Sequence, residues 1–415
     1  MKRLLLLLLG LLSQPASAQQ IPSTSIEARR EIAAAFEKGD RIALTHAAMA
    51  LTEMGAGFSD AEFDRIAPML DPATITAPPY RWRQGPNGPV ELLRHHFHEN
   101  AVPIPFGSRP EHYAWVPARY RLVEGIAYDF ATARLFIGTV VEGRLAYREK
   151  GRWREVPIGS PRGGLFGMAV DAKRRLLWIA TGSVAQTAVP GKRLTGLIAL
   201  DLDRLRVVHR IPVPAGRQGT EGDLAIAEDG TVYSSNSATG AIHRCRPGCV
   251  RLETLVAPGR FPSPQGLAVA PDGEHLIVAD YATGIWIVDV KDGSAAPPHL
   301  DSPVMLDGID GLRIERGPNA ERLVGIQNGT FPRRIVKFYI DTDGTGMGHP
   351  REIFTFPASA GEATLGTLIE HQTMFFVADG QWERYGPGGR LKDGKPARPT
   401  PIHSMSFREP DGTFQ

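Results

Sequence analysis

The stretch that decides the fold is SPQGLAVAPDGEHLIVADYATGIWIVDV, residues 263–290. It contains three short apolar runs, GLAV, HLIVAD and GIWIVDV, separated by the turn-forming sequences PDG and YATG. Runs of this length that are rich in Val and Ile and bounded by Gly, Pro and Asp are typical of β-strands joined by tight turns. The stretch therefore predicts three strands, with the polar Gln265 standing just before Gly266, where the first strand starts.

The same arrangement occurs six times along the chain. In each case one residue precedes a Gly or Asp, and a short apolar strand follows with one or two further strands behind it. A period of about 40–50 residues with several strands per unit is typical of a β-propeller. We therefore predict an all-β fold, a six-bladed β-propeller over residues 119–403. The residues that open the six units are Glu124, Phe166, Gly222, Gln265, Asp310 and Leu365.

A propeller arranges its innermost strands around a central channel, and a Gly at the start of such a strand lets neighbouring backbones approach closely. The opening residues are then expected at one channel mouth, so Glu124, Gln265 and Asp310 should converge there. Two unpaired carboxylates repel each other, which a bound cation would relieve. Oxygen-only ligands favour Ca²⁺, or alternatively Mn²⁺ or Mg²⁺. The other interpretation is a hydrogen-bonded, water-filled channel plug.

The propeller region resembles the SMP-30/gluconolactonase/LRE-like family of the regucalcin type, on the phrases LVEGIAYD, SPQGLAVAPDG and IDGLRI, over residues 120–400. The resemblance implies a six-bladed propeller with one divalent metal at the central mouth, held by Glu124, Gln265 and Asp310, and it makes Asp310 the general base. The sequence departs from the family at two positions. Gln265 occupies the place of a ligand Asn, and Gly222 stands where the family usually has another Asn.

Further polar residues are expected near the same mouth. Asp223, next to Gly222, is a second candidate for the base that takes a proton from the attacking water. Three residues at or just beyond the ends of second strands, and Trp382 in the last unit, are candidates for substrate binding. The alternative is that they cap turns and strand ends, as Asn and Asp commonly do. These candidates are Asn236, Asp280, Asn328 and Trp382.

The N-terminus has the layout of a secretory signal peptide over residues 1–18. Lys2 and Arg3 precede an apolar run, and Ala16-Ser17-Ala18 is a small-residue cleavage site. We therefore expect a periplasmic or secreted protein; an uncleaved anchor is the alternative. No later segment has the roughly 18 apolar residues of a membrane span. The 47 basic and 45 acidic residues become 45 and 45 without Lys2 and Arg3, which gives no electrostatic reason to expect nucleic acid as a partner.

Residues 19–75 predict an α-helical segment. It is rich in Ala, Leu and Glu, breaks at Gly39-Asp40, and has a capping box at Ser59–Glu62 that should open a third helix. Helices of this kind must dock on another surface, which could be the propeller or a protein partner. Residues 76–118 are interpreted as a connector with one strand, in which the cluster of three His (95, 96 and 98) lies in a polar loop, and 404–415 as a tail. Cys245 and Cys249 could form a disulfide in an oxidising compartment.

Together these features predict an exported, divalent-metal-dependent hydrolase that acts on lactones or similar small esters. The chain has no Gly-x-Ser-x-Gly, His-Glu-x-x-His or phosphate-loop pattern, which disfavours serine hydrolases and nucleotide enzymes. The alternative is a non-enzymatic propeller that binds a ligand or, through the N-terminal helices, a protein partner; Gly222, Gln265 and the apolar Phe166 and Leu365 favour it. A third option is a strictosidine-synthase-like propeller without metal chemistry.

Overall fold

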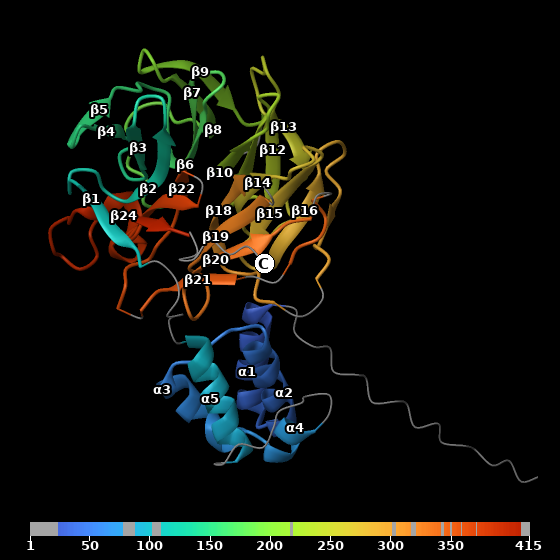
Figure 1. Cartoon of the computed structure of the whole chain (residues 1–415). Coiled ribbons are helices and arrows are strands. Elements are labelled where there is room, and N and C mark those ends of the chain that lie inside the picture. The colour runs from blue at the N-terminus through green and yellow to red at the C-terminus, as the bar shows by residue number, and fades with distance from the viewer. Residues whose placement is uncertain are drawn as a thin grey trace, which may run out of the picture.

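The structure of the chain is a computed structural model that describes residues 24–77, 88–101, 109–215, 219–300, 304–316, 321–341, 344–348, 351–357, 359–370 and 372–407. It contains six four-stranded sheets, preceded by a group of helices (Figure 1). The prediction of a six-bladed β-propeller behind a small helical segment is confirmed. The proposed signal peptide lies outside the described residues. Among the described helices none is long and apolar enough to cross a membrane.

The first five blades each consist of four consecutive antiparallel strands. The turn sequences read from the chain separate these strands as expected. The strands of blades one to three are β2 (Val123–Asp129), β3 (Arg134–Thr139), β4 (Leu145–Glu149), β5 (Arg152–Val156), β6 (Gly164–Asp171), β7 (Leu176–Gly182), β8 (Gly196–Asp201), β9 (Arg206–Pro212), β10 (Glu221–Ile226), β11 (Val232–Asn236), β12 (Ala241–Cys245) and β13 (Glu253–Val256). Those of blades four and five are β14 (Pro264–Val269), β15 (His275–Asp280), β16 (Gly284–Asp289), β17 (Ala295–Ala296), β18 (Ile309–Arg316), β19 (Glu321–Gln327), β20 (Arg334–Tyr339) and β21 (Arg351–Thr355).

The sixth blade joins the two ends of the propeller. It has the order β1-β24-β23-β22, with β1 (Glu111–Val116) taken from the N-terminal side and β22 (Gly366–Glu370), β23 (Thr373–Val377) and β24 (Thr400–Ser406) from the C-terminal side. The predicted boundaries differ here. The segment predicted as a connector supplies the outer strand of this blade, and the last strand runs three residues into the predicted tail. Pairing of β1 with β24 closes the ring, so residues 111–116 and 400–406 are integral to the propeller.

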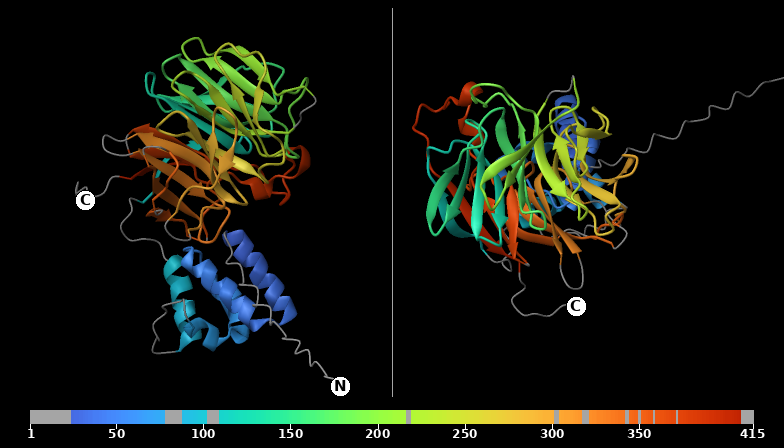
Figure 2. Two further views of the ribbon diagram at one scale, coloured as in Figure 1. Left: turned by 90° about the vertical axis from the view of Figure 1, so that its right-hand side faces the viewer. Right: turned by 90° about the horizontal axis from the view of Figure 1, so that it is seen from above.

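The helices form one bundle beside the propeller (Figures 1 and 2). The break and the capping box lie where the sequence predicts them: Gly39 ends the first helix with φ 68°, Asp40 caps the second, and Ser59 and Glu62 form a capping box. The helices are α1 (Ser25–Lys38), α2 (Arg41–Glu53), α3 (Asp60–Ile66), α4 (Pro72–Thr76) and α5 (Pro89–Ala101), and the short 3-10 helices are η1 (Ala67–Met69), η2 (Trp382–Arg384) and η3 (Pro387–Gly389).

Helix α5 lies inside the segment that was predicted as a connector, so the three His predicted in a loop are on a helix instead. Leu93 and Phe97, four residues apart, are both buried in the core of the bundle. This spacing is the pattern of a helix face packed against a core. The Pro and Gly residues around the segment hide the pattern, because they favour a loop interpretation over such a short window.

Helix α1 docks on the propeller through its N-terminus. The carboxylate of Asp307, just before β18, accepts hydrogen bonds from the Ser25 backbone N–H (3.1 Å), the Ser25 hydroxyl (2.7 Å) and the Ile26 backbone N–H (3.0 Å). An acidic side chain is stabilised at a helix N-terminus, where backbone N–H groups have no intrahelical partner. Met305 also joins the apolar core of the bundle. Of the two docking surfaces considered, the helices use the propeller; a protein partner stays a prediction.

The inner strands β2, β6, β10, β14, β18 and β22 contact one another in this order and close the ring. Their glycines are required by close approach. A Cβ on Gly125 would lie 2.2 Å from the carbonyl oxygen of Phe166, and one on Gly266 would lie 2.5 Å from the backbone nitrogen of Leu312. Buried apolar side chains fill the space between adjacent blades. On the outer part of blade three, Cys245 and Cys249 form a disulfide with a Cα–Cα distance of 5.5 Å.

Candidate active site at an acidic channel mouth

The opening residues lie at irregularities of the inner strands. In blade one, Val123 pairs with Thr139 and Gly125 with Gly138, so Glu124 is left out of the ladder. Corresponding register shifts occur in blades two to five, at the positions that include Phe166, Gly222, Gln265 and Asp310. A β-bulge bends the strand and re-aims the side chain of the unpaired residue. The repeat therefore places one unpaired opening residue from each of the first five blades at the same end of the channel.

Glu124 and Asp310 are 186 positions apart in the sequence. In the structure they lie close enough for the charge of Asp310 to act on Glu124. Burial raises the pKa of Glu124 well above its usual range, and the negative charge of Asp310 raises it further. Burial also raises the pKa of Asp310 to about 7, against the hydrogen bond from Asn328, and the charge of Glu362 contributes. We call this end of the channel, defined by Glu124, Asp310 and Glu362, the acidic mouth.

Hydrogen bonds hold the two carboxylates in place. The indole N–H of Trp382 donates to Oε2 of Glu124 at 2.8 Å. The amide of Asn328 donates to Oδ2 of Asp310 at 2.9 Å, and its own oxygen accepts from the hydroxyl of Tyr281 at 2.9 Å. The Asn328 amide also donates to the carbonyl of Ala363 at 2.8 Å, so Asn328 is fixed by three partners. Both Asn328 and Trp382, predicted to bind substrate, lie at the acidic mouth as contacts of its carboxylates.

Two residues of this mouth were missed from the sequence. Glu362 lies in the loop before β22, three residues ahead of Leu365, and Tyr281 follows the end of β15. The pKa of Glu362 is raised, chiefly by burial and then by the charge of Glu383. The place of Glu362 just ahead of a blade opening was the available signal for it. Tyr281 had none, because its partner Asn328 belongs to the next blade.

Asp223, the second predicted base, has a different environment. It is 1 % exposed and forms a two-point ion pair with Arg313, with Nη1–Oδ2 and Nη2–Oδ1 distances of 2.6 and 3.1 Å. Burial raises the pKa of Asp223, while the charge of Arg313 opposes the rise. To act as a base, this carboxylate would have to give up two charge-assisted hydrogen bonds. In this structure Asp223 pairs with Arg313, and its role as a base stays a prediction.

Asn236 and Asp280 also use their polar atoms inside the protein. Asn236 is fully buried; its amide donates to Oε1 of Glu221 at 2.8 Å, and its oxygen accepts from the Thr239 backbone N–H at 3.1 Å. Asp280 is fully buried too, and accepts from the Ser263 backbone N–H at 2.7 Å and from both the N–H and the hydroxyl of Thr283 at 2.8 Å. These contacts match the alternative considered from the sequence, in which the two residues cap turns.

The side chain of the third predicted metal ligand, Gln265, forms a hydrogen bond within its own blade. The Gln265 amide nitrogen donates to the hydroxyl of Ser263 at 3.1 Å, and its oxygen lies 3.5 Å from the point where a Cβ of Gly222 would stand. Because Gly222 has no side chain, the space next to the Gln265 oxygen is not filled by residue 222. Within the described ranges, no three His, Cys, Asp or Glu side chains are close enough together to hold a metal ion.

The chemistry of the remaining donors nevertheless suits a hard divalent cation. Glu124 and Asp310 are neighbouring carboxylates with raised pKa values, and a cation would offset their repulsion. In the part of the chain that the structure describes, the hydrogen bonds to the Asp310 carboxylate use Oδ2, which leaves Oδ1 to bind a further partner.

Comparison with known proteins gives a match of fold. No family model matches the chain, and no curated protein matches it in sequence. Among solved structures, the major allergen Mala s 1 of Malassezia sympodialis is 14% identical with a TM-score of 0.54, over 74% of this chain and 99% of that one. A gluconolactonase from Xanthomonas campestris is 18% identical with a TM-score of 0.46, over 74% and 96%. A calcium-binding regucalcin from Agrobacterium tumefaciens strain C58 is 16% identical with a TM-score of 0.45, over 72% and 96%. Identities this low establish the propeller fold alone.

Proposed function

We propose that this protein is an exported, divalent-metal-dependent hydrolase of lactones or similar small esters, with its active site at the acidic mouth. The observation that carries the proposal is Asp310, whose pKa of about 7 lies near neutral pH while Asn328 fixes its position. A general base is most effective when its pKa is close to the working pH. Asp310 would take the proton of the water that attacks the substrate carbonyl.

Glu124 and Asp310 would hold the cation, Ca²⁺ or alternatively Mn²⁺ or Mg²⁺, with the oxygen of Gln265 as a third ligand after rotation. The bound ion would polarise the carbonyl group and stabilise the developing oxyanion. Trp382 keeps Glu124 in place, and Asn328, itself held by Tyr281, does the same for Asp310. The rotation of Gln265 is open because Gly222 presents no side chain to it.

Export is the second part of the proposal. It is supported by the predicted signal peptide over residues 1–18 and by the disulfide between Cys245 and Cys249, a bond that persists in oxidising compartments.

The test is hydrolysis of a panel of sugar lactones and short-chain esters by the purified mature protein, with added Ca²⁺ or Mn²⁺ and with EDTA. We expect turnover that depends on the metal and a rise in melting temperature on metal addition. Both effects should be lost in Glu124→Gln and kept in Glu37→Gln, an exposed helical glutamate that serves as the matched control. Binding of panel members without turnover would instead support the ligand-binding alternative and overturn the hydrolase.

A further inference from the structure

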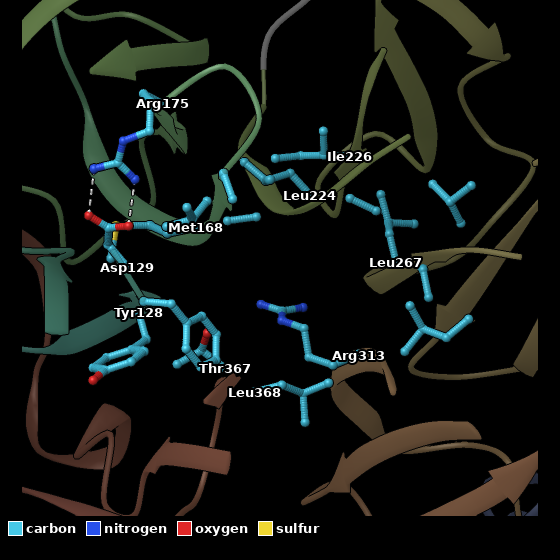
Figure 3. A pocket seen from close by; sticks show the side chains of 18 of the residues that line it. Tyr128, Asp129, Met168, Arg175, Leu224, Ile226, Leu267, Arg313, Thr367 and Leu368 are labelled. Atoms are coloured by element: carbon cyan, nitrogen blue, oxygen red, sulfur yellow. Dashed lines mark hydrogen bonds and ion pairs between the residues drawn. The ribbon is translucent and has the colours of Figure 1, made fainter. Parts of the chain in front are cut away.

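A cavity of about 520 Å³ lies at the opposite ends of the inner strands (Figure 3). Its lining comes from the later residues of these strands, whereas the acidic mouth is built from their first residues. Its volume falls within the roughly 300–1,000 Å³ typical of small-molecule sites. The wall is mostly apolar and includes Met168, Leu224, Ile226, Leu267 and Leu368. We call it the apolar cavity.

One charged group projects into the middle of this apolar wall. Figure 3 shows the guanidinium of Arg313 directed between the side chains of Met168, Leu224 and Leu267. The Arg313 side chain is 15% exposed. Arg is rarely buried without partners. The N–H groups of Arg313 that the protein leaves without a partner therefore indicate what a ligand could bind there.

Arg313 has five N–H donors, and the protein uses three of them. Nη1 donates to Oδ2 of Asp223 and, at 2.7 Å, to the carbonyl of Leu312, while Nη2 donates to Oδ1 of Asp223. The Nε–H and the second N–H of Nη2 have no partner among the described residues. These two donors lie parallel on one edge of the guanidinium, in the geometry that binds both oxygens of a carboxylate or one shared oxygen.

A second arginine in the same protein shows this edge in use. Arg175, at the border of the cavity, is bound end-on by Asp129 through Nη1 and Nη2 at 2.7 and 2.9 Å. Its other edge is bound by Asp203, with Nε and Nη2 at 3.2 and 2.9 Å from the same carboxylate oxygen. One guanidinium in this chain thus accommodates two carboxylates. Arg313, which lines the cavity, has only the first of them.

We propose that the apolar cavity binds a small monocarboxylate with an apolar body, such as a medium-chain fatty acid. The ligand carboxylate takes the position on Arg313 that Asp203 takes on Arg175, and the hydrocarbon chain packs on the apolar wall. Asp223 already balances the charge of Arg313, so the ligand adds one net negative charge. Its affinity therefore rests on the paired hydrogen bonds and on burial of the chain together. This site is separate from the acidic mouth and does not depend on the proposed hydrolase activity.

The test is calorimetric titration of the whole mature protein with octanoate, and with octanamide as the uncharged analogue of the same length. We expect saturable binding of one octanoate per chain and at least tenfold weaker binding of octanamide. Arg313→Lys keeps a positive charge beside Asp223 but loses the paired donors, and should bind octanoate at least tenfold more weakly. Arg174→Lys is the matched control with unchanged affinity, because Arg174 pairs with Asp171 outside the cavity wall.

A second variant keeps the test decisive if Arg313→Lys does not fold. Thr367 lines the cavity and is only partly buried, so Thr367→Trp should fill the space with Arg313 intact. This variant should lose octanoate binding while its melting temperature stays close to that of the wild type. Absence of saturable octanoate binding to the wild type, equal binding of octanamide, or undiminished binding by Thr367→Trp would each overturn the proposal.

Discussion

The acidic mouth and the apolar cavity are the two ends of the same inner strands, yet their chemistry is opposite. At the first residues of the strands, register shifts re-aim Glu124 and Asp310 out of the ladder. Toward the other end the ladder of blades three and four is regular, and their apolar side chains Leu224 and Leu267 line the space. The ion pair of Asp223 with Arg313 joins blades three and five between these regions. A single repeated strand can therefore supply two different sites, because the bulge changes which side chains face the channel.

The largest expected effect concerns the acidic mouth alone. Asp310→Asn removes the proposed base but keeps an oxygen that can accept from Asn328. We expect kcat/KM for the best lactone or ester to fall about 10²–10⁴-fold, the usual contribution of a general base. In the wild type, kcat/KM should rise with pH as Asp310 loses its proton, with a midpoint below about 7 because the bound cation lowers the pKa of this carboxyl. Asp64→Asn, at an exposed surface pair, is the control. Unchanged turnover in Asp310→Asn would contradict the assignment.

The next largest effect is expected from breaking the ion pair of Asp223 with Arg313, which lies between the acidic mouth and the apolar cavity. Asp223→Asn leaves the guanidinium of Arg313 without its compensating charge in a largely buried position. Removing one partner of a buried pair costs about 3–5 kcal/mol, so the free energy of unfolding measured in urea should fall by this amount. Asp203→Asn offers a comparison at an exposed pair, where the loss should stay below about 1 kcal/mol. Similar losses in the two variants would show that the Asp223–Arg313 pair contributes no more than a surface contact.

A smaller effect is expected from weakening the contact between helix α1 and the propeller, which should affect the acidic mouth but not the apolar cavity. Asp307, which binds the N-terminus of α1, lies three residues before Asp310. Asp307→Ala removes hydrogen bonds that involve a charged group and leaves the α1 N–H groups without an acceptor. We expect faster hydrogen exchange in α1 and β18 and lower hydrolytic activity. Octanoate affinity should be unchanged, and a matching loss of both functions would argue against separate sites.

The smallest effect is a pH dependence of stability in metal-free protein. The pKa of Asp310 rises from 3.8 to about 7 on folding, so the folded state binds this proton more tightly than the unfolded state. The stabilisation is complete below about 3.8 and is lost as the pH rises through 7. Asp310→Asn should therefore melt a few degrees higher than the wild type at pH 8, with the difference shrinking toward pH 5. A constant difference across this range would mean that Asp310 does not titrate there.

The sequence by itself determined the number of blades and one end of the channel. Apolar runs, turn residues and the period of the openings are local features, and they were sufficient to place Glu124 and Asp310 at a common mouth. Local chemistry likewise determined the helix break at Gly39 and the capping box at Ser59. Such features can be read because strand and helix boundaries depend on residues only a few positions apart.

Only the tertiary structure decided which side chains meet across the channel. The pairing of Asp223 with Arg313, the approach of Glu362 to Asp310, and the closure of blade six by β1 each join segments far apart in the chain. The sequence identified Asp223 as a base because nothing near it in the chain showed that a guanidinium from another blade would reach it. The hydrogen bonds and the pKa of a polar side chain depend on the groups that surround it after folding. These groups come from parts of the chain that no local sequence pattern connects.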